Sequence, residues 1–533
     1  MKKRCLFAAA VFSALLLLAV LRRYCAGEAR GSAGTYGALP EDLGTEDPLA
    51  YLAEDFTVRE GFSTNLPLVV LETEGELAEY KYFSYGEEVS DGTKDPWTAG
   101  HIRIISGEGG RNTLWDAASY TGDIVIKKRG HTSFAYDKPQ YLIKLADASG
   151  EPCDADLLGI GEGNGWVLNG SMADKSMLRN YLACRIASEA SGAAMAPDCR
   201  FCEVVRYEDG RYVYQGVYLL MESVERGRDR IDIDEAKKKN VYTSYIVRRD
   251  RYTNFDPMLD TYGRINGLSE EWIGLKYPPK RKLTEESLAY IEADFSKTEQ
   301  ILYSRDASVF GVYDKYIDVD SFVDYFLINE FFGNYDAGQH STYMYKESGG
   351  KLKIGPVWDF DQAMNNYYAQ EMEPETLAFQ TKPFFENLCR DKAFIRRLKS
   401  RYAVLRRGAL SEEHVFSVLD QAADCLKSAG QREWFRWAAD YLDDSFENAG
   451  NYYLYDYERD GITISRFNDD YEQELYLIRT YLHRHAGVIQ GELTKLLEAA
   501  EYDTSARSQN GRLLLVIMLL FLVPSVLIHR KGA

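Results

Sequence analysis

The chain has 533 residues, enough for two or three ordinary domains or one large bilobal domain. Hydrophobic residues make up 45% of it and aromatic residues 13%, a composition that excludes general disorder. With 82 acidic against 63 basic residues, the net charge of −19 would repel a polyanion, so no nucleic-acid partner is expected.

Both ends of the chain are apolar. Residues 5–21 and 513–528 carry no charge, and each stretch is at the short limit for a membrane helix. We therefore expect a membrane anchor over 1–26 and a transmembrane helix over 511–529, with a cleavable signal peptide as the alternative for the first. Basic residues on the outer flanks favour cytoplasmic tails, which places the body on the extracytoplasmic side of the cell membrane.

The first half of the chain predicts mainly strands. Residues 27–60 are rich in Gly, Ala, Glu and Asp and are interpreted as a spacer. Apolar residues at helical spacing predict one helix over 171–191, with Asp174 as its cap. Apolar and β-branched runs predict strands at 66–75, 101–106, 122–130 and 140–147, and then a hairpin of 200–207 and 214–222.

The second half predicts mainly helices. Residues 318–333 are amphipathic and end at a glycine, which is a common residue after a helix. Further helices are predicted at 391–407, 411–428, 431–442 and 470–498, with Ser411 at the N-terminus of the second. The sequence thus indicates a β-rich first part, a site at the junction and an α-rich second part.

The cysteines give little support for a metal site. Cys199 and Cys202 form the one CxxC motif among eight cysteines. A structural zinc site normally needs a second such pair, so a disulfide or two unrelated thiols are the open alternatives.

The segment GPVWDFDQAMNN, residues 355–366, follows an apparent strand and places Asp359 and Asp361 two residues apart between large aromatic residues. In an extended segment, both carboxylates point to the same side. Carboxylates so close repel each other unless a cation lies between them, and Mg²⁺ prefers such oxygen ligands. Asp336 follows the helix that ends at Gly333; an ordinary turn residue is the alternative for it.

Five patches in order resemble the CotH family, the spore-coat-protein-H-type atypical protein kinases. They are KKRGHTSFAYDKPQYLIKL (127–145), DKSMLRNYLA (174–183), YQGVYLLMESVERG (214–227), NYDAGQHSTYMY (334–345) and GPVWDFD (355–361). The resemblance implies an α+β, protein-kinase-like bilobal fold with a β-rich N-lobe and an α-rich C-lobe, here flanked by two transmembrane helices. It also implies ATP and Mg²⁺ or Mn²⁺ as cofactors. We expect a kinase-like domain over 61–385 and a helical extension of it over 386–505.

The resemblance also assigns roles to the acidic residues. Asp359 occupies the place of the metal-binding aspartate in the Asp-Phe-Gly motif of conventional kinases, and Asp361 is expected to bind metal beside it. Asp336 is placed as the catalytic aspartate that orients the substrate hydroxyl or accepts its proton. Ser341 stands five residues later, where conventional kinases carry a metal-binding Asn, and is a weaker candidate ligand.

More than one basic residue could bind the phosphates. Lys144, on a predicted strand, is the preferred partner, and Lys138 in the preceding loop is the second choice. Arg129 and Gly130 resemble a shortened phosphate-covering loop, although solvated bases at a strand end are the simpler interpretation. Arg179 is expected either to face the cleft or to be structural, and Glu222 either to lie near the nucleotide or to pair with a neighbouring base.

These observations lead to one expected function with a clear alternative. The first is a membrane-tethered extracytoplasmic protein kinase that transfers the γ-phosphate of ATP to hydroxyls of secreted or surface proteins of an envelope or coat. The alternative is a non-catalytic surface scaffold or adhesion module for envelope or coat assembly, favoured by Ser341 and by the lack of a Gly-rich loop. No sugar ligand is expected, because Asp359 and Asp361 are too close in sequence to flank a glycosidic bond.

Overall fold

The computed structural model describes residues 36–42, 44, 47–77, 96–107, 109–130, 133, 136–170, 172–366, 375–441, 457–459, 462–464 and 471–505. The predicted membrane segments, 1–26 and 511–529, lie outside these residues. Within the described part, no helix combines the length and the apolar character needed to span a membrane.

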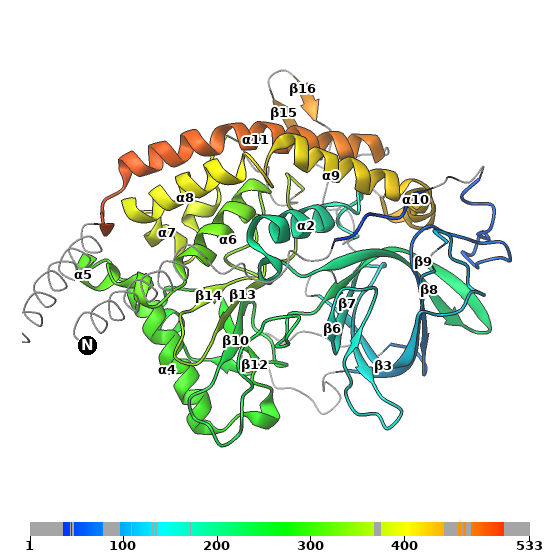
Figure 1. Cartoon of the computed structure of the whole chain (residues 1–533), viewed down its shortest axis with the longest axis horizontal. Helices are drawn as coiled ribbons and strands as arrows, with labels where there is room; N and C mark the ends of the chain where they lie inside the picture. The colour runs from blue at the N-terminus through cyan, green and yellow to red at the C-terminus, as the bar shows by residue number, and fades with distance from the viewer. Residues whose placement is uncertain are drawn as a thin grey trace, which may run out of the picture.

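Seven strands of the first half close into a barrel (Figure 1). Neighbouring strands run antiparallel except for the closing pair, β1 and β8, which run parallel with Leu68 opposite Glu203. Alternate side chains point inward and fill the barrel with apolar residues such as Val69, Ile104 and Ile143. In spatial order the strands are β1 (Leu68–Thr73), β2 (Thr98–Ile105), β3 (Tyr120–Arg129), β4 (Gln140–Ala146), β7 (Gly165–Asn169), β9 (Arg211–Glu222) and β8 (Cys199–Glu208).

A second, five-stranded sheet lies beside the barrel (Figure 1). Its strands, in spatial order, are β11 (Met258–Leu259), β12 (Trp272–Tyr277), β10 (Tyr245–Asp250), β13 (Thr342–Lys346) and β14 (Lys353–Ile354). Two small hairpins, β5 (Ala155–Asp156) with β6 (Glu162–Gly163) and β15 (Tyr457–Arg459) with β16 (Ile462–Ile464), complete the strands of the described residues.

A layer of helices extends over both the barrel and the second sheet (Figure 1). Its main members are α2 (Arg179–Ser191), α6 (Val319–Phe331), α8 (Lys392–Leu405), α9 (Glu412–Cys425), α10 (Lys427–Tyr441) and the long α11 (Tyr471–Ala499). The remaining helices of the described part are α3 (Tyr262–Ile265), α4 (Glu285–Leu302), α5 (Ala307–Phe310) and α7 (Phe385–Leu388). One large apolar core joins α2, α6 and α8 to the second sheet.

The predicted elements of the first 230 residues are largely confirmed, and so is the α+β class. The four strands and the hairpin appear as β1 to β4 and as β8 with β9. The helix α2 begins at Arg179, later than predicted, but Asp174 still accepts a hydrogen bond from the first amide of that helix at 2.9 Å. Part of the predicted spacer packs on the barrel, because Leu52 and Val58 are buried there.

The two-part layout expected from the sequence needs a correction. The β-rich region is a closed seven-stranded barrel, because β1 also pairs with β8, and the described residues do not form a clear kinase-like bilobal layout. The second half is not simply helical, since β10 to β14 form a sheet of their own within it. The predicted helices after residue 318 are confirmed as α6, α8, α9, α10 and α11, with Ser411 capping α9.

Cys199 and Cys202 form no disulfide. Both thiols are buried on β8, and burial raises the pKa of each above its ordinary value. Of the two alternatives left by the sequence, the unrelated thiols are therefore correct.

Two buried ion pairs fasten α10 to the barrel. Arg432 donates two hydrogen bonds to Glu203, at 2.7 and 2.8 Å. Lys138 donates to Glu433 at 2.6 Å and to the Val217 carbonyl at 2.7 Å, and its side chain is 1% exposed. Lys138 therefore cannot meet a phosphate without breaking this pair, and its assignment as the second-choice phosphate cation is wrong.

We expect Lys138→Met to destabilise the fold, because it leaves Glu433 as a buried, unpaired charge. The free energy of unfolding, measured by urea denaturation, should fall by about 3–5 kcal/mol. Lys144→Met is the control: Lys144 is exposed, so its replacement should change that free energy by no more than about 0.5 kcal/mol. Equal losses for the two variants would contradict the structural role of Lys138.

Candidate functional site

A cavity of about 480 Å³ opens between the barrel and the second sheet. Its walls come from β3, β4, β10 and β12 and from two loops, residues 334–341 and 357–362. Seven of the ten candidate residues line it, namely Arg129, Gly130, Lys144, Asp336, Ser341, Asp359 and Asp361. Segments far apart in the sequence thus meet around one space.

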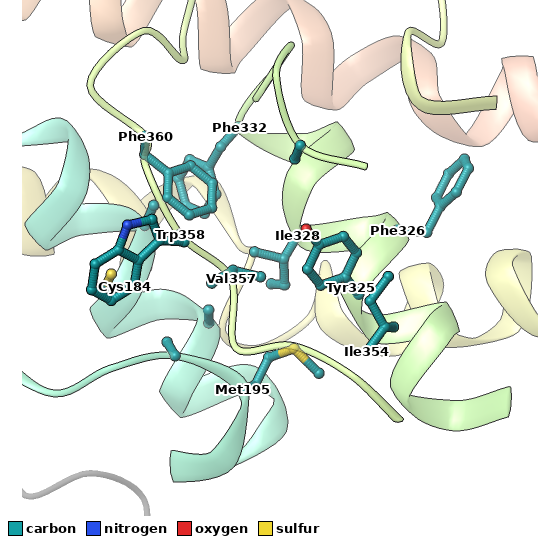
Figure 2. Close-up of a cluster of buried hydrophobic side chains, with 14 of the residues drawn as sticks. Cys184, Met195, Tyr325, Phe326, Ile328, Phe332, Ile354, Val357, Trp358 and Phe360 are labelled. Atoms are coloured by element: carbon teal, nitrogen blue, oxygen red, sulfur yellow. The ribbon is translucent and has the colours of Figure 1, made fainter. Parts of the chain in front are cut away.

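The segment with Asp359 and Asp361 is fixed by its neighbours on both sides. The amide of Val357 donates to the Met195 carbonyl at 2.7 Å, and the amide of Phe360 donates to the Asn180 side chain at 2.7 Å. Phe360 is fully buried, and its ring lies 5.9 Å from that of Phe332 at the end of α6. Figure 2 shows the two rings side by side, with Val357 and Trp358 in the same cluster. The expectation that Phe360 packs into the core is confirmed.

The two aspartates reach the cavity in a different way from the one expected. The backbone of Asp359 is in the left-handed region, with φ of 53°, so the segment is not an extended strand. Such a conformation is strained for a residue with a side chain and persists because the anchors on either side impose it. Both carboxylates nevertheless line the same cavity.

Burial raises the pKa of both carboxyl groups, and neighbouring negative charges raise it further. For Asp359, burial raises the pKa, and the Arg129 guanidinium and a hydrogen bond with Ser341 offset this in part. For Asp361, burial and then the charge of Asp359 raise the pKa to about 7. The carboxylates face the cavity but are surrounded by protein on their other sides, which is why their charges are poorly solvated.

The loop with Asp336 is joined to the Asp359 segment. It begins after α6, and Asn334 donates from its side chain to the Trp358 carbonyl at 3.0 Å. The Asp336 carbonyl accepts from the His340 amide at 2.9 Å, which closes a tight turn. Asp336 is half-buried at the cavity wall, and its charge contributes to the raised pKa of Asp361. The three aspartates are therefore close enough to interact.

The barrel supplies the cations of the site. The Arg129 side chain donates to Gln140 at 2.7 Å and lies 5.6 Å from the centre of the Trp358 ring. Gly130 follows with φ of 105°, a conformation that favours glycine. Lys144 is exposed at the cavity, with its ammonium 4.9 Å from the centre of the Trp97 ring.

Two further candidates lie outside the cavity. Arg179 is buried, pairs with Asp174 at 2.6 Å and with Glu474 at 3.2 Å, and donates to the Ala363 carbonyl. The prediction that Arg179 faces the cleft is wrong. The alternative, a structural role, is correct, because its guanidinium is neutralised by these two carboxylates.

Glu222 is also directed away from the cavity. It pairs with Arg230 and accepts from the amide of Asp198 at 2.8 Å, and burial raises its pKa to about 7. The simpler interpretation, a strand-end glutamate paired with a base, is therefore correct. Its neighbour Glu225 lines the cavity instead.

Several cavity residues were not predicted from the sequence. Arg248 and Asp250 are two apart on β10, so the alternation of a strand presents both to the cavity. Asp256 pairs with Lys276 of β12 at 3.1 Å. Burial acts to raise the pKa of Asp256, but the charges of Lys276 and Arg248 and the hydrogen bond from Lys276 together outweigh it and lower the pKa. The sequence Arg-Arg-Asp at the end of this strand could have indicated that charged side chains from β10 line the cavity.

The donor chemistry suits a hard divalent cation, although the set is small. Asp359 and Asp361 present carboxylate oxygens to one space, and their mutual repulsion would be relieved by a bound cation. Within the described ranges, no group of three or more His, Cys, Asp or Glu side chains is arranged to hold a metal ion. Any metal here would take two protein carboxylates and complete its shell from substrate and water.

The raised pKa of Asp361 makes the stability of the fold depend on pH. A carboxyl with a pKa of about 7 when folded, against about 3.9 when unfolded, stabilises the fold fully below the lower value, and this contribution is lost as the pH rises through about 7. Asp361→Asn removes that loss. Its Tm relative to the wild type should therefore rise between pH about 5 and about 8, measured by calorimetry without divalent metal.

Asp503→Asn provides a control of opposite sign. Its Arg396 partner lowers the pKa of Asp503 to about 2, so the relative Tm of this variant should not rise over the same pH interval. A relative Tm of Asp361→Asn that stays constant with pH would mean that Asp361 titrates normally.

Comparison with known proteins identifies the family of the chain. The family model described as CotH kinase protein matches residues 126–459, a range that contains the three aspartates, Arg129 and Lys144. No curated protein matches the chain. Because the match spans more than half of the 533 residues, the chain belongs to the CotH kinase protein family.

Proposed function

We propose that this protein is an ATP-dependent protein kinase that transfers the γ-phosphoryl group to hydroxyls of secreted or surface proteins. The observation that carries the proposal is the convergence of Asp336, Asp359 and Asp361 on a cavity whose barrel wall carries Arg129 and Lys144. Phosphoryl transfer requires acidic side chains that bind a metal ion and orient the acceptor hydroxyl, and basic side chains that bind the phosphates.

The bases of the cavity are suited to a triphosphate. Arg129 has a planar guanidinium that matches a phosphate and is held in place by Gln140. Lys144 lines the same cavity from β4 and would add a second positive charge on the barrel wall. Arg248 lines it from β10, where it pairs with Asp250 at 3.3 Å and with Asp256 at 3.7 Å. In a partly enclosed site, these charges act on the phosphates more strongly than they would in open water.

The acids are suited to the metal and to the acceptor. Asp359 and Asp361 would hold Mg²⁺ or Mn²⁺, which when bound neutralises charge on the phosphates. Asp336 lies on the other loop and would orient the acceptor hydroxyl and take its proton as that oxygen bonds to the γ-phosphorus and the bond to ADP breaks. Ser341 is engaged with Asp359 and would support that carboxylate rather than bind a second metal.

The setting of this reaction is proposed from the sequence. The apolar segments over 1–26 and 511–529 would tether the protein to the cell membrane with its body on the extracytoplasmic side. Acceptors of an envelope or coat would then lie within reach of the site.

A specific observation also supports a second candidate, a non-catalytic scaffold for envelope or coat assembly. Ser341 stands where a metal-binding amide is expected, and the described part of the chain holds no cluster of three metal-ligating side chains. A scaffold of this kind would keep the fold but gain no stability from ATP and Mg²⁺.

Binding of the nucleotide with metal separates the two candidates. A ligand at one hundred times its Kd stabilises a protein by about 2.7 kcal/mol, so the full-length chain should show a clear rise in Tm with ATP and Mg²⁺ together. Asp359→Asn should abolish the part of the shift that depends on Mg²⁺. Asp314→Asn, an exposed aspartate outside the cavity, should retain it. No shift for the wild type would favour the scaffold.

The role of Asp336 is tested by phosphate transfer. With radiolabelled ATP, and with dephosphorylated casein or the chain itself as acceptor, Asp336→Asn should lower kcat by about 10²–10⁴-fold. Its shift in Tm with ATP and Mg²⁺ should remain, because Asp336 is assigned to the acceptor and not to the nucleotide. Undiminished transfer by Asp336→Asn would rule out this assignment.

A further inference from the structure

Lys382 contacts the loop that carries Asp336 on both sides of the aspartate. Its ammonium donates to the side-chain oxygen of Gln339 at 2.9 Å. The same ammonium lies 4.1 Å from the centre of the Tyr335 ring, a cation–π contact. The residue is 5% exposed and does not line the cavity, so it acts on the loop from the protein side.

The loop and the Lys382 segment fit closely at Gly338. This glycine has φ of 88°, and a Cβ atom there would lie 2.8 Å from the Cβ of Lys382. Any other residue would force the two segments apart. The Gly338 amide donates to the Thr342 hydroxyl at 2.8 Å, which fixes the loop to the start of β13.

Arg249 holds the same loop from another direction. It is fully buried between Arg248 and Asp250 of β10, and it points away from the cavity that those two residues line. Its guanidinium donates to the Gly338 carbonyl at 3.1 Å. Two buried cations from different elements therefore hold one short loop.

Lys382 is itself held in place by a buried network. The Glu330 carboxylate of α6 accepts from the amides of Ala378 and Phe379 at 3.1 and 2.7 Å. His485 of α11 lies 3.1 Å from that carboxylate and 2.7 Å from the Glu330 carbonyl. The short 3₁₀ turn η5 (Phe379–Thr381) that precedes Lys382 is thus tied to two long helices.

The charge of Lys382 is balanced mainly by Asp336. Burial lowers the pKa of Lys382, and the negative charges of Asp336, Glu271 and Glu330 act in the opposite direction, with Asp336 the strongest. Within the residues that the structure describes, no carboxylate lies in ion-pair contact with Lys382. Its attraction to Asp336 is therefore exerted across the loop, in surroundings of low dielectric where such forces are strong.

We propose that Lys382 is a positioning residue for Asp336: through Gln339 and Tyr335, and together with Arg249, it keeps the aspartate in place while the phosphoryl group is transferred. This proposal rests on the proposed function. Because Lys382 does not line the cavity, its loss should slow the chemical step and leave nucleotide binding intact.

The test compares Lys382→Met, Lys382→Arg and Gln339→Ala with Lys346→Met in the full-length chain. Lys346 is a buried lysine of β13 that pairs with Asp294 at 2.8 Å and does not line the cavity, so it controls for loss of a buried ammonium. The readouts are Tm, the Tm shift with ATP and Mg²⁺, kcat and KM for ATP, and amide hydrogen exchange of residues 335–341.

We expect Lys382→Met to lower kcat by about 100-fold, with KM for ATP and the ATP–Mg²⁺ shift within about twofold of the wild type. Exchange at 335–341 should speed up, Lys382→Arg should restore most of the activity, and Lys346→Met should change neither kcat nor this exchange. Gln339→Ala keeps Lys382 and should give a smaller fall in kcat than Lys382→Met. If Lys382→Met fails to fold, the kcat of Gln339→Ala tests the positioning role instead.

An active wild type with unchanged kcat and unchanged loop exchange in Lys382→Met and Gln339→Ala would overturn the proposal. So would a Lys382→Arg variant as impaired as Lys382→Met, since that result would show that the positive charge and its hydrogen bond are not what matters. A wild type that neither binds ATP nor transfers phosphate would instead refute the proposed function, and the positioning role with it.

Discussion

The packing of Phe360 into the core is the constraint on which the site depends. The ring is fully buried against Phe332, and the amide of Phe360 is held by Asn180 of α2. The aspartates on either side of Phe360 line the cavity. The strained backbone of Asp359 persists between this anchor and the Val357 amide, which donates to the Met195 carbonyl.

The cavity is a place where the protein accepts poorly compensated charge. Two buried ion pairs elsewhere, Lys138 with Glu433 and Arg432 with Glu203, show the contrast. In the cavity, burial raises the pKa of both carboxyl groups, the charge of Asp359 raises that of Asp361 further, and Arg129 offsets only part of the effect at Asp359. Unbalanced charge of this kind is typical of sites that bind an ion or a charged ligand.

The two loops of the site are built in different ways. The Asp359 segment is held by core packing and two backbone contacts, whereas the Asp336 loop is held by cations and by the close fit at Gly338. Asn334 joins them by donating to the Trp358 carbonyl. The proposed phosphoryl transfer would need the two loops to be aligned with each other in this way.

The sequence by itself determined the local elements and the family. Patterns of period two and 3.6 identified β1 to β4, the β8–β9 hairpin and the later helices, because side-chain burial alternates with those periods. The order of five motifs was enough to find Asp336, Asp359 and Asp361. Only the tertiary structure decided which charged residues share the cavity with them: Lys138, Arg179 and Glu222 form buried pairs outside it, whereas Arg248 and Asp250 enter it from a separate sheet. Both outcomes depend on partners that lie far apart in the chain. Local residue spacing therefore predicts neither the closure of the barrel by β1 and β8 nor which charged side chains are paired.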